Sequence, residues 1–189
     1  MKTTLLACLI LLTTIACNQP VKKVDSDTSV RMPHEASAEA RTKKAETTTY
    51  YLIRHAEKDR SNPTNKDPKL TAEGVARSKK WADYFDAIPL DQIYSTSYLR
   101  TQQTSAYVAT RQNLMVEHYE VGKLYTEDFK MLTKGQQVLI IGHSNTTPAL
   151  VNKIIGRDTY VDMKDDDNAS LYKVTIEAGE ARVQVFKVN

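Results

Sequence analysis

The sequence predicts an α/β fold with a mainly parallel central sheet. Segments with the β-branched and aromatic composition of strands alternate along the chain with segments that have the apolar period of amphipathic helices. Residues 137–141 form a continuous apolar run, which is typical of a central strand buried on both faces. The length of 189 residues suits one such domain with a short extension.

The expected elements begin at residue 47. Residues 47–53 predict a strand because they are β-branched and aromatic, and a polar loop with Pro63 and Pro68 follows them. Thr71 is a good helix cap, and an apolar stripe continues from it to about Asp86. The remaining elements are a strand at 91–94, a helix from 98 to about 112, a strand at 114–119, a short helix, the buried strand at 137–141, a helix from 147 to 156, and a closing hairpin of 170–176 and 182–188.

Three polar residues follow the expected strands. His55 lies at the end of the first strand, Arg100 shortly after the second, and His143 at the end of the buried strand. In open α/β sheets, functional groups gather beyond the carboxyl ends of the strands. We therefore expect these three side chains, which are far apart in sequence, at one rim of the sheet.

The composition excludes several kinds of site. The chain has 26 basic and 23 acidic residues, and its formal net charge of +3 predicts no general attraction to nucleic acid. Cys8 and Cys17 are the only cysteines, so the rest of the chain has no thiol for a disulfide, a cysteine nucleophile or a zinc–thiolate site. We expect no metal and no cofactor, and a bound anion would need a local cluster of cations.

The amino terminus has the pattern of an export signal. Lys2 is followed by an apolar stretch at 5–15, which has the length of a signal-peptide core and is too short to span a bilayer. The tetrapeptide Thr-Ile-Ala-Cys at 14–17 resembles the lipobox of bacterial lipoproteins, in which the cysteine is lipidated and becomes the mature amino terminus. We expect a lipoprotein signal peptide at 1–17 with lipidation at Cys17; an ordinary cleaved signal peptide is the alternative.

Residues 18–46 predict a flexible tether. They are polar and of mixed charge, with no sustained apolar period. Together with the lipobox, this segment predicts an exported protein that is periplasmic or on the cell surface and anchored to the membrane through Cys17.

Four sequence blocks occur in order across the expected domain. They are residues 52–58 with the pair Arg54-His55, residues 70–74, residues 94–104 with Arg100, and residues 141–146 with His143. Together they resemble the histidine phosphatase superfamily, which includes the cofactor-dependent phosphoglycerate mutases. The resemblance implies a phosphoglycerate mutase-like three-layer α/β/α sandwich over residues 47–189, and in length the chain resembles the compact bacterial phosphohistidine phosphatases.

The resemblance also implies a metal-independent enzyme with a phosphohistidine intermediate on His55. A transferred phosphoryl group carries spread negative charge, which Arg54 and Arg100 can bind with their planar guanidinium groups. His55 can attack phosphorus only through an unprotonated ring nitrogen, which nearby arginines favour. The resemblance places His143 beside the phosphate as a donor, and Asn145 can add a further donor near a helix start.

The general acid is less clear from the sequence. Some members of the family have Asp directly after the second histidine, where this chain has Ser144. Glu57 is the first candidate and Glu120 the second, with Glu127 and Asp128 as others. The run of three aspartates at 165–167 predicts a solvated acidic loop, because its spacing does not match a calcium-binding loop.

The expected function is hydrolysis of phosphomonoesters or phosphohistidine. A non-catalytic phosphate-binding module and a phosphoglycerate mutase-type phosphotransferase are the alternatives. The interval between Arg100 and His143 is short and leaves little chain for a lid, so we expect an open pocket. Such a pocket could accept a phosphorylated small molecule or a phosphoprotein.

Overall fold

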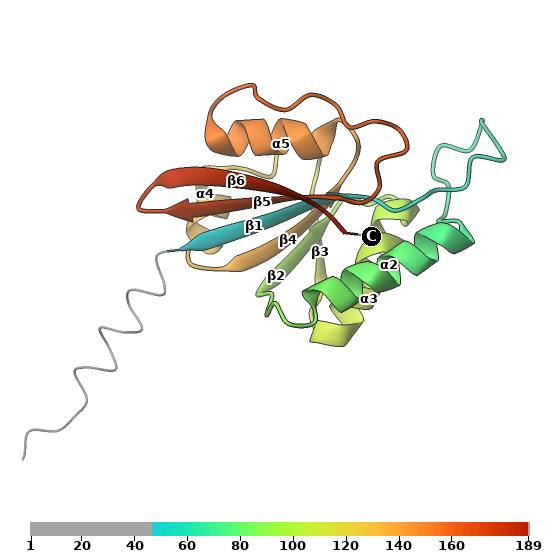
Figure 1. Cartoon of the computed structure of the whole chain (residues 1–189), viewed down its shortest axis with the longest axis horizontal. Coiled ribbons are helices and arrows are strands. Elements are labelled where there is room, and N and C mark those ends of the chain that lie inside the picture. Colours follow the sequence, from blue (N-terminus) through green and yellow to red (C-terminus); the bar gives the residue numbers. More distant parts are fainter. Residues whose placement is uncertain (1–46, 189) are drawn as a thin grey trace, which may run out of the picture. The chain divides into compact units, whose positions relative to one another are not determined.

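The computed structural model describes residues 47–188. The predicted signal peptide at 1–17, the lipidation site Cys17 and the tether at 18–46 lie outside the described residues. In the part that the structure describes, six strands form one sheet and four helices pack on it (Figure 1). The elements are β1 (Thr48–Arg54), α2 (Ala72–Phe85), β2 (Gln92–Ser95), α3 (Leu99–Gln112), β3 (Val116–His118), α4 (Glu127–Leu132), β4 (Gln137–Gly142), α5 (Thr146–Ile155), β5 (Ser170–Glu177) and β6 (Glu180–Lys187).

The sheet has the mainly parallel character that the sequence predicts. Its strand order is β3-β2-β4-β1-β5-β6. Strands β3, β2, β4 and β1 pair in parallel, whereas β5 and β6 add antiparallel to the edge beyond β1. Because β4 and β1 lie in the middle, the continuous apolar run of β4 is buried as expected.

Two hydrophobic cores cover the two faces of the sheet. Alternate residues of β1 point to opposite faces: Tyr50 and Leu52 pack in one core, and Tyr51 and Ile53 in the other. The first core includes side chains of α4 and α5, and the second includes side chains of α2 and α3. Figure 1 shows α5 on one face of the sheet with α2 and α3 on the other. The three-layer α/β/α architecture is thus confirmed.

Two element boundaries differ from the sequence prediction for local reasons. The third strand is limited to Val116–His118, because the Leu114 amide donates to the Ala109 carbonyl and completes the end of α3 instead. In the carboxyl-terminal hairpin, Ala178 and Gly179 both have positive φ, 50° and 83°. Two such residues make a tight type I′ turn, so the strands extend to Glu177 and Glu180.

The start of α2 supports the loop that follows β1. The Thr71 side chain caps the helix by accepting from the Gly74 amide at 3.1 Å, as the sequence predicts. The Thr71 amide donates to the Glu57 carbonyl at 2.9 Å. A side chain at Gly74 would collide with that same carbonyl group, so this glycine permits the close approach of helix and loop.

Among residues 47–188, no helix combines the length and the hydrophobicity that a membrane span needs.

Candidate active site

A hollow at one rim of the sheet contains the residues that the sequence singles out. Arg54 ends β1 and pairs in register with Gly142, the last residue of β4. The histidines that follow these two strand ends therefore lie side by side, with 5.5 Å between the ring centroids of His55 and His143. Arg100, in the first turn of α3, lines the same hollow, which has a volume of about 370 Å³. We call it the phosphate hollow.

His55 is held with one ring nitrogen free. Its Nδ1 lies 2.7 Å from the Ala56 carbonyl oxygen, which can only accept, so Nδ1 carries the proton and Nε2 is unprotonated. The residue is 3% exposed, and burial is the main cause that lowers its pKa to about 3; Arg54, His143 and Arg100 lower it further. The arginines thus lower the pKa of His55 as expected, but burial lowers it more. His55 is neutral at physiological pH.

Arg54 is buried and held by the segment before β5. Its Nη1 donates to the carbonyl oxygens of Lys164 and Asp165 at 2.8 and 2.9 Å, and its Nη2 donates to Asp165 Oδ1 at 3.1 Å. Its Nε is also buried and has no hydrogen-bond partner among the described protein atoms. One donor of this guanidinium therefore remains for a bound anion.

The acidic loop at 165–167 is largely exposed, as the sequence predicts: Asp165 and Asp166 lie at the surface, whereas Asp167 is partly buried and pairs with Lys187. Asp165 lines the phosphate hollow and forms ion pairs with Arg54 and, at 2.7 Å, with Arg60. Its carboxylate stays largely exposed, but the backbone of the loop folds back over Arg54 and fixes its direction. Hydrogen bonds from Arg60 and Arg54 hold the pKa of Asp165 below its usual range, so it is ionised at neutral pH.

Arg100 offers the largest set of unused donors. Its Nε and Nη1 are buried without a hydrogen-bond partner among the described atoms, and the Asp67 carboxylate is 3.7 Å from Nη1, too far for a hydrogen bond. The guanidinium carbon lies 4.2 Å from the centroid of the Tyr98 ring, which orients the group by a cation–π contact. Arg100 is therefore fixed in place with donors free for an anion.

His143 is neutral and already has two partners. Its Nδ1 lies 3.4 Å from Arg100 Nη2, and because a guanidinium only donates, Nδ1 accepts. The proton is therefore on Nε2, which lies 3.0 Å from Thr96 Oγ1. Burial, followed by the charges of Arg100, Lys58 and Arg54, lowers the pKa of His143 to about 4. Donation from His143 to a phosphate oxygen would require Nε2–H to exchange its contact with Thr96.

The start of α5 closes one side of the phosphate hollow. Asn145 is the N-cap of α5, but its side chain makes no capping hydrogen bond, and it lines the hollow together with Ser144. The helix N-terminus carries a partial positive charge, which favours an anion beside it. A side chain at Gly142 would press against the hydroxyls of Thr147 and Thr146, so only glycine permits this sharp passage from β4 to α5.

The structure does not bring the two expected general acids into the phosphate hollow. Glu57 lines a neighbouring charged hollow, where its carboxylate accepts from Arg77 Nε at 2.5 Å. Glu120 is exposed and pairs with Lys123. Among the described residues that line the phosphate hollow, Asp165 is the only carboxylate.

Lys58 also lines the phosphate hollow, although no sequence pattern singled it out. Burial, followed by the charges of Arg100 and Arg60, lowers the pKa of Lys58. Within residues 47–188, no group of three or more His, Cys, Asp or Glu side chains is placed to hold a metal ion.

Part of the chain that carries the site is similar to a known family. Residues 50–121, which include Arg54, His55 and Arg100, match the family model described as histidine phosphatase superfamily (branch 1). No curated protein matches the chain.

Solved structures of several bacterial enzymes share the fold. The protein histidine phosphatase SixA complexed with tungstate has a TM-score of 0.60 at 17% identity, covering 74% of this chain and 96% of that chain. A putative phosphohistidine phosphatase SixA from Agrobacterium tumefaciens has a TM-score of 0.55 at 22% identity, covering 74% and 97%. A phosphoglycerate mutase from Bacillus anthracis has a TM-score of 0.58 at 15% identity, covering 77% and 95%. At these identities the likeness concerns the fold, which is phosphoglycerate mutase-like.

Several residues that shape the candidate site were not found from the sequence. Asn168 donates to the His55 carbonyl at 2.8 Å, and Thr104 accepts from the Ala56 amide at 2.9 Å. Thr96 holds His143. Thr96 and Thr104 lie inside the Arg100 sequence block, which was a usable signal, whereas nothing in the sequence around Asn168 indicates its contact with residue 55.

Proposed function

We propose that the chain is a metal-independent phosphatase that hydrolyses phosphomonoesters or phosphohistidine through a phosphohistidine intermediate on His55. One observation carries the proposal: His55, neutral and with Nδ1 bonded to the Ala56 carbonyl, lines a hollow in which Arg54 and Arg100 keep buried guanidinium donors without a protein partner. A buried unpartnered donor is costly unless a ligand satisfies it. A phosphoryl group provides three acceptor oxygens at that place.

The first chemical step transfers the phosphoryl group to the enzyme. The lone pair of His55 Nε2 attacks phosphorus while the bond from phosphorus to the leaving oxygen or nitrogen breaks, and the leaving atom takes a proton. Nδ1–H, held by the Ala56 carbonyl, stabilises the positive charge that forms on the ring. Arg54, Arg100 and the start of α5 bind the negative charge on the phosphoryl oxygens.

The second step releases phosphate. Water attacks phosphorus and gives a proton back to the group that protonated the leaving atom, while the bond to His55 Nε2 breaks with its electron pair returning to the nitrogen, so the ring is again neutral. Splitting one displacement into two steps avoids a direct attack of water on the substrate.

Lys58 is the residue that we propose as proton donor to the leaving group. Asp165 is the one carboxylate among the described residues of the hollow, and its lowered pKa makes it a poor acid. Lys58 lines the same hollow, and burial near Arg100 and Arg60 lowers its pKa and makes its ammonium group more acidic. Glu57 and Glu120 would have to leave their ion pairs with Arg77 and Lys123 to take this role.

The test uses three variants and two measurements. His55→Ala should abolish turnover of an aryl phosphate, and Arg100→Ala should lower it about a hundredfold or more. Arg111→Ala, on the same helix but bound to Asp83 outside the hollow, is the control and should remain active. Rapid quenching of the wild type with a ³²P-labelled ester should trap an acid-labile label that His55→Ala lacks.

Other outcomes would favour the alternatives. Near-normal turnover by His55→Ala contradicts the proposal. Phosphate binding without turnover or label would indicate a non-catalytic binding module. Transfer of phosphate from a diphosphorylated primer to a phosphoglycerate would indicate a mutase.

We also propose that the protein is an exported bacterial lipoprotein held at the membrane through Cys17. The lipobox-like tetrapeptide and the polar stretch at 18–46 support this proposal. A phosphatase placed there would act on phosphorylated small molecules or phosphoproteins outside the cytoplasm.

A further inference from the structure

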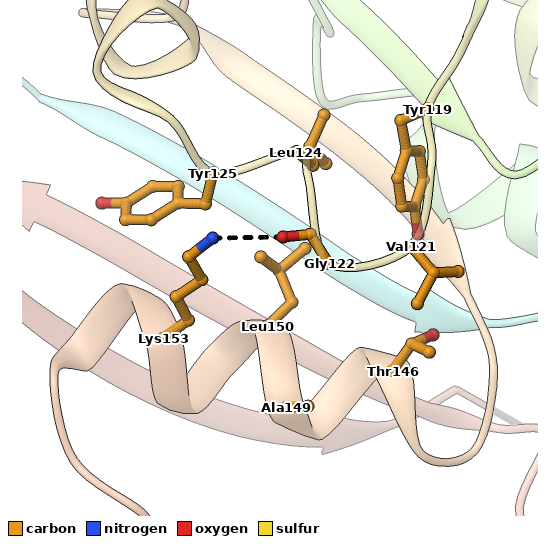
Figure 2. Close-up of a pocket in the computed structure, with 9 residues that line it drawn as sticks. All are labelled: Tyr119, Val121, Gly122, Leu124, Tyr125, Thr146, Ala149, Leu150 and Lys153. Carbon is orange, nitrogen blue, oxygen red and sulfur yellow. Dashed lines mark hydrogen bonds between the residues drawn. The ribbon is translucent and has the colours of Figure 1, made fainter.

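A second hollow with apolar walls adjoins the phosphate hollow. It lies between α5 and the segment 119–125 and has a volume of about 170 Å³ (Figure 2). Val121 and Thr146 line both hollows, so the two hollows are neighbours. Figure 2 shows Val121 and Thr146 at one end of this apolar hollow, with Tyr125 and Lys153 at the other.

Three polar side chains around the apolar hollow, those of Tyr119, Thr146 and Lys153, already have partners in the protein. Tyr119 Oη donates to the Ile141 carbonyl at 3.1 Å, and Thr146 Oγ1 accepts from the His143 amide at 2.9 Å. Lys153 Nζ donates to the Gly122 carbonyl at 3.4 Å. These groups leave mainly ring faces and aliphatic carbons toward the hollow, so a ligand there gains from apolar contact rather than from hydrogen bonds.

The size of the apolar hollow fits one ring. A cavity of about 150 Å³ lined by aliphatic and aromatic side chains, engineered in another protein, binds benzene. Along α5, the seven-residue step from Thr146 to Lys153 spans about 10 Å. Because Val121 and Thr146 line both hollows, the substrate shape that this arrangement favours is a single aromatic or alicyclic ring joined to the phosphate directly or through one carbon.

The neighbouring charged hollow is a weaker candidate for the leaving group. It shares Lys58 and Asp165 with the phosphate hollow, but its charges pair with one another, Arg77 with Glu57 and Arg60 with Asp165. A ligand there would have to compete with these ion pairs. The apolar hollow requires no such exchange.

We propose that the apolar hollow binds the leaving group of the substrate, so that the enzyme prefers phosphate esters of small aromatic or alicyclic alcohols. This inference rests on the proposed phosphatase function of the adjoining hollow. Burying a ring in such a space should raise kcat/KM about tenfold or more over that of an ester with a short alkyl group.

The test compares benzyl phosphate with ethyl phosphate, because both release a primary alcohol and differ mainly in the ring. The full-length wild type should prefer benzyl phosphate by about tenfold or more in kcat/KM. Ala149→Phe, which adds a ring at the α5 wall of the apolar hollow, should lower kcat/KM for benzyl phosphate more than for ethyl phosphate and so remove that preference. Ala106→Phe, at an exposed position of α3 away from both hollows, is the matched control and should keep the preference.

Binding of two non-hydrolysable analogues separates this inference from the proposed function. Calorimetry should show tighter binding of benzylphosphonate than of ethylphosphonate, and Ala149→Phe should lose this difference. That result supports the apolar hollow as a binding site even if neither ester is turned over. In that case only the phosphatase proposal would fail. Equal kcat/KM for the two esters in the wild type, or equal effects of Ala149→Phe on both, overturns the inference. Equal affinity for the two phosphonates overturns it as well.

Discussion

At the scale of single residues, burial sets the protonation of the site more strongly than charge does. His55 and His143 have pKa values of about 3 and 4 because both are desolvated, and the neighbouring arginines add to the effect. In an unfolded chain the same groups would titrate near 6.5. Both rings therefore stay neutral in the folded protein across the physiological range, which is the state that a nucleophilic nitrogen requires.

The pH dependence of the two rings follows from these values. Between pH 6.5 and about 4 the unfolded chain binds more protons than the folded one, so the free energy of unfolding should fall as the pH is lowered through this window. Ring ¹⁵N spectra should show no titration of His55 or His143 between pH 8 and 5, and His55 Nε2 should have the shift of an unprotonated nitrogen. A His118→Asn variant assigns the signal of that exposed ring. A midpoint near 6.5 for His55 would contradict the burial argument.

Variants of Lys58 can distinguish the proposed proton donation from an effect of its positive charge. Lys58→Met should lower kcat/KM for esters with alkyl leaving groups by about 10²–10⁴, and 4-nitrophenyl phosphate much less, because a good leaving group needs no proton. Lys58→Arg keeps the charge but cannot readily release a proton, and it should show the same selectivity. The measurement is the slope of log kcat/KM against leaving-group pKa, which should steepen. The exposed control Lys66→Met should leave the slope unchanged. An unchanged slope for the Lys58 variants would show that Lys58 acts only through its charge.

Sequence reasoning located the residues at strand ends but not those that act through loops. Arg54, His55 and His143 could be placed because a parallel sheet brings the carboxyl ends of β1 and β4 together. Asp165 reaches Arg54 across 111 positions of sequence, through a loop whose path depends on the finished fold. No local pattern in the sequence encodes such a contact, although the exposure of Asp165 itself follows the sequence prediction.

At the scale of elements, periodicity and helix caps predicted the strands and helices from the sequence, whereas the geometry of the loops could not be predicted. The alternation in β1, the apolar run of β4 and the Thr71 cap all follow local rules, and the structure has them where expected. The contact of the α2 start with the loop after His55 is different. It depends on the fit between two backbones, which a single sequence does not display.

Replacing Gly74 tests the contact between the start of α2 and the loop after His55. In an ordinary helix interior, glycine to alanine stabilises by roughly 0.5–1 kcal/mol. Here a Cβ would collide with the Glu57 carbonyl, so Gly74→Ala should lower the free energy of unfolding by about 1–3 kcal/mol. Because the displaced loop also carries the Ala56 carbonyl that fixes His55, kcat should fall as well. Urea unfolding together with aryl phosphate turnover measures both effects, and a stabilised, fully active variant would contradict the argument.

At the scale of the whole molecule, the layer architecture was predictable because every strand and helix obeys one pattern of alternation along the chain. The apolar hollow was not, since it forms between α5 and a segment without regular structure. The short interval from Arg100 to His143 predicted an open site, and the described residues place two further hollows next to the phosphate hollow. Specificity would then arise from these neighbours rather than from a lid.

The proposed lipid anchor makes different predictions for the two cysteines. Cys17 follows an apolar stretch of signal-peptide length, whereas cleavage before Cys8 would leave too few apolar residues ahead of it for export. Cys17→Ser should therefore remove the lipid anchor and move the protein from the membrane fraction to the soluble periplasmic fraction, or leave it unprocessed. Because acyl chains anchor a protein by burial in the bilayer, their loss should not alter kcat/KM of the folded domain. Cys8→Ser is the matched control and should stay with the membranes. Cell fractionation with immunoblotting reads both variants, and a Cys17→Ser protein that partitions like the wild type would show that Cys17 is not the anchor.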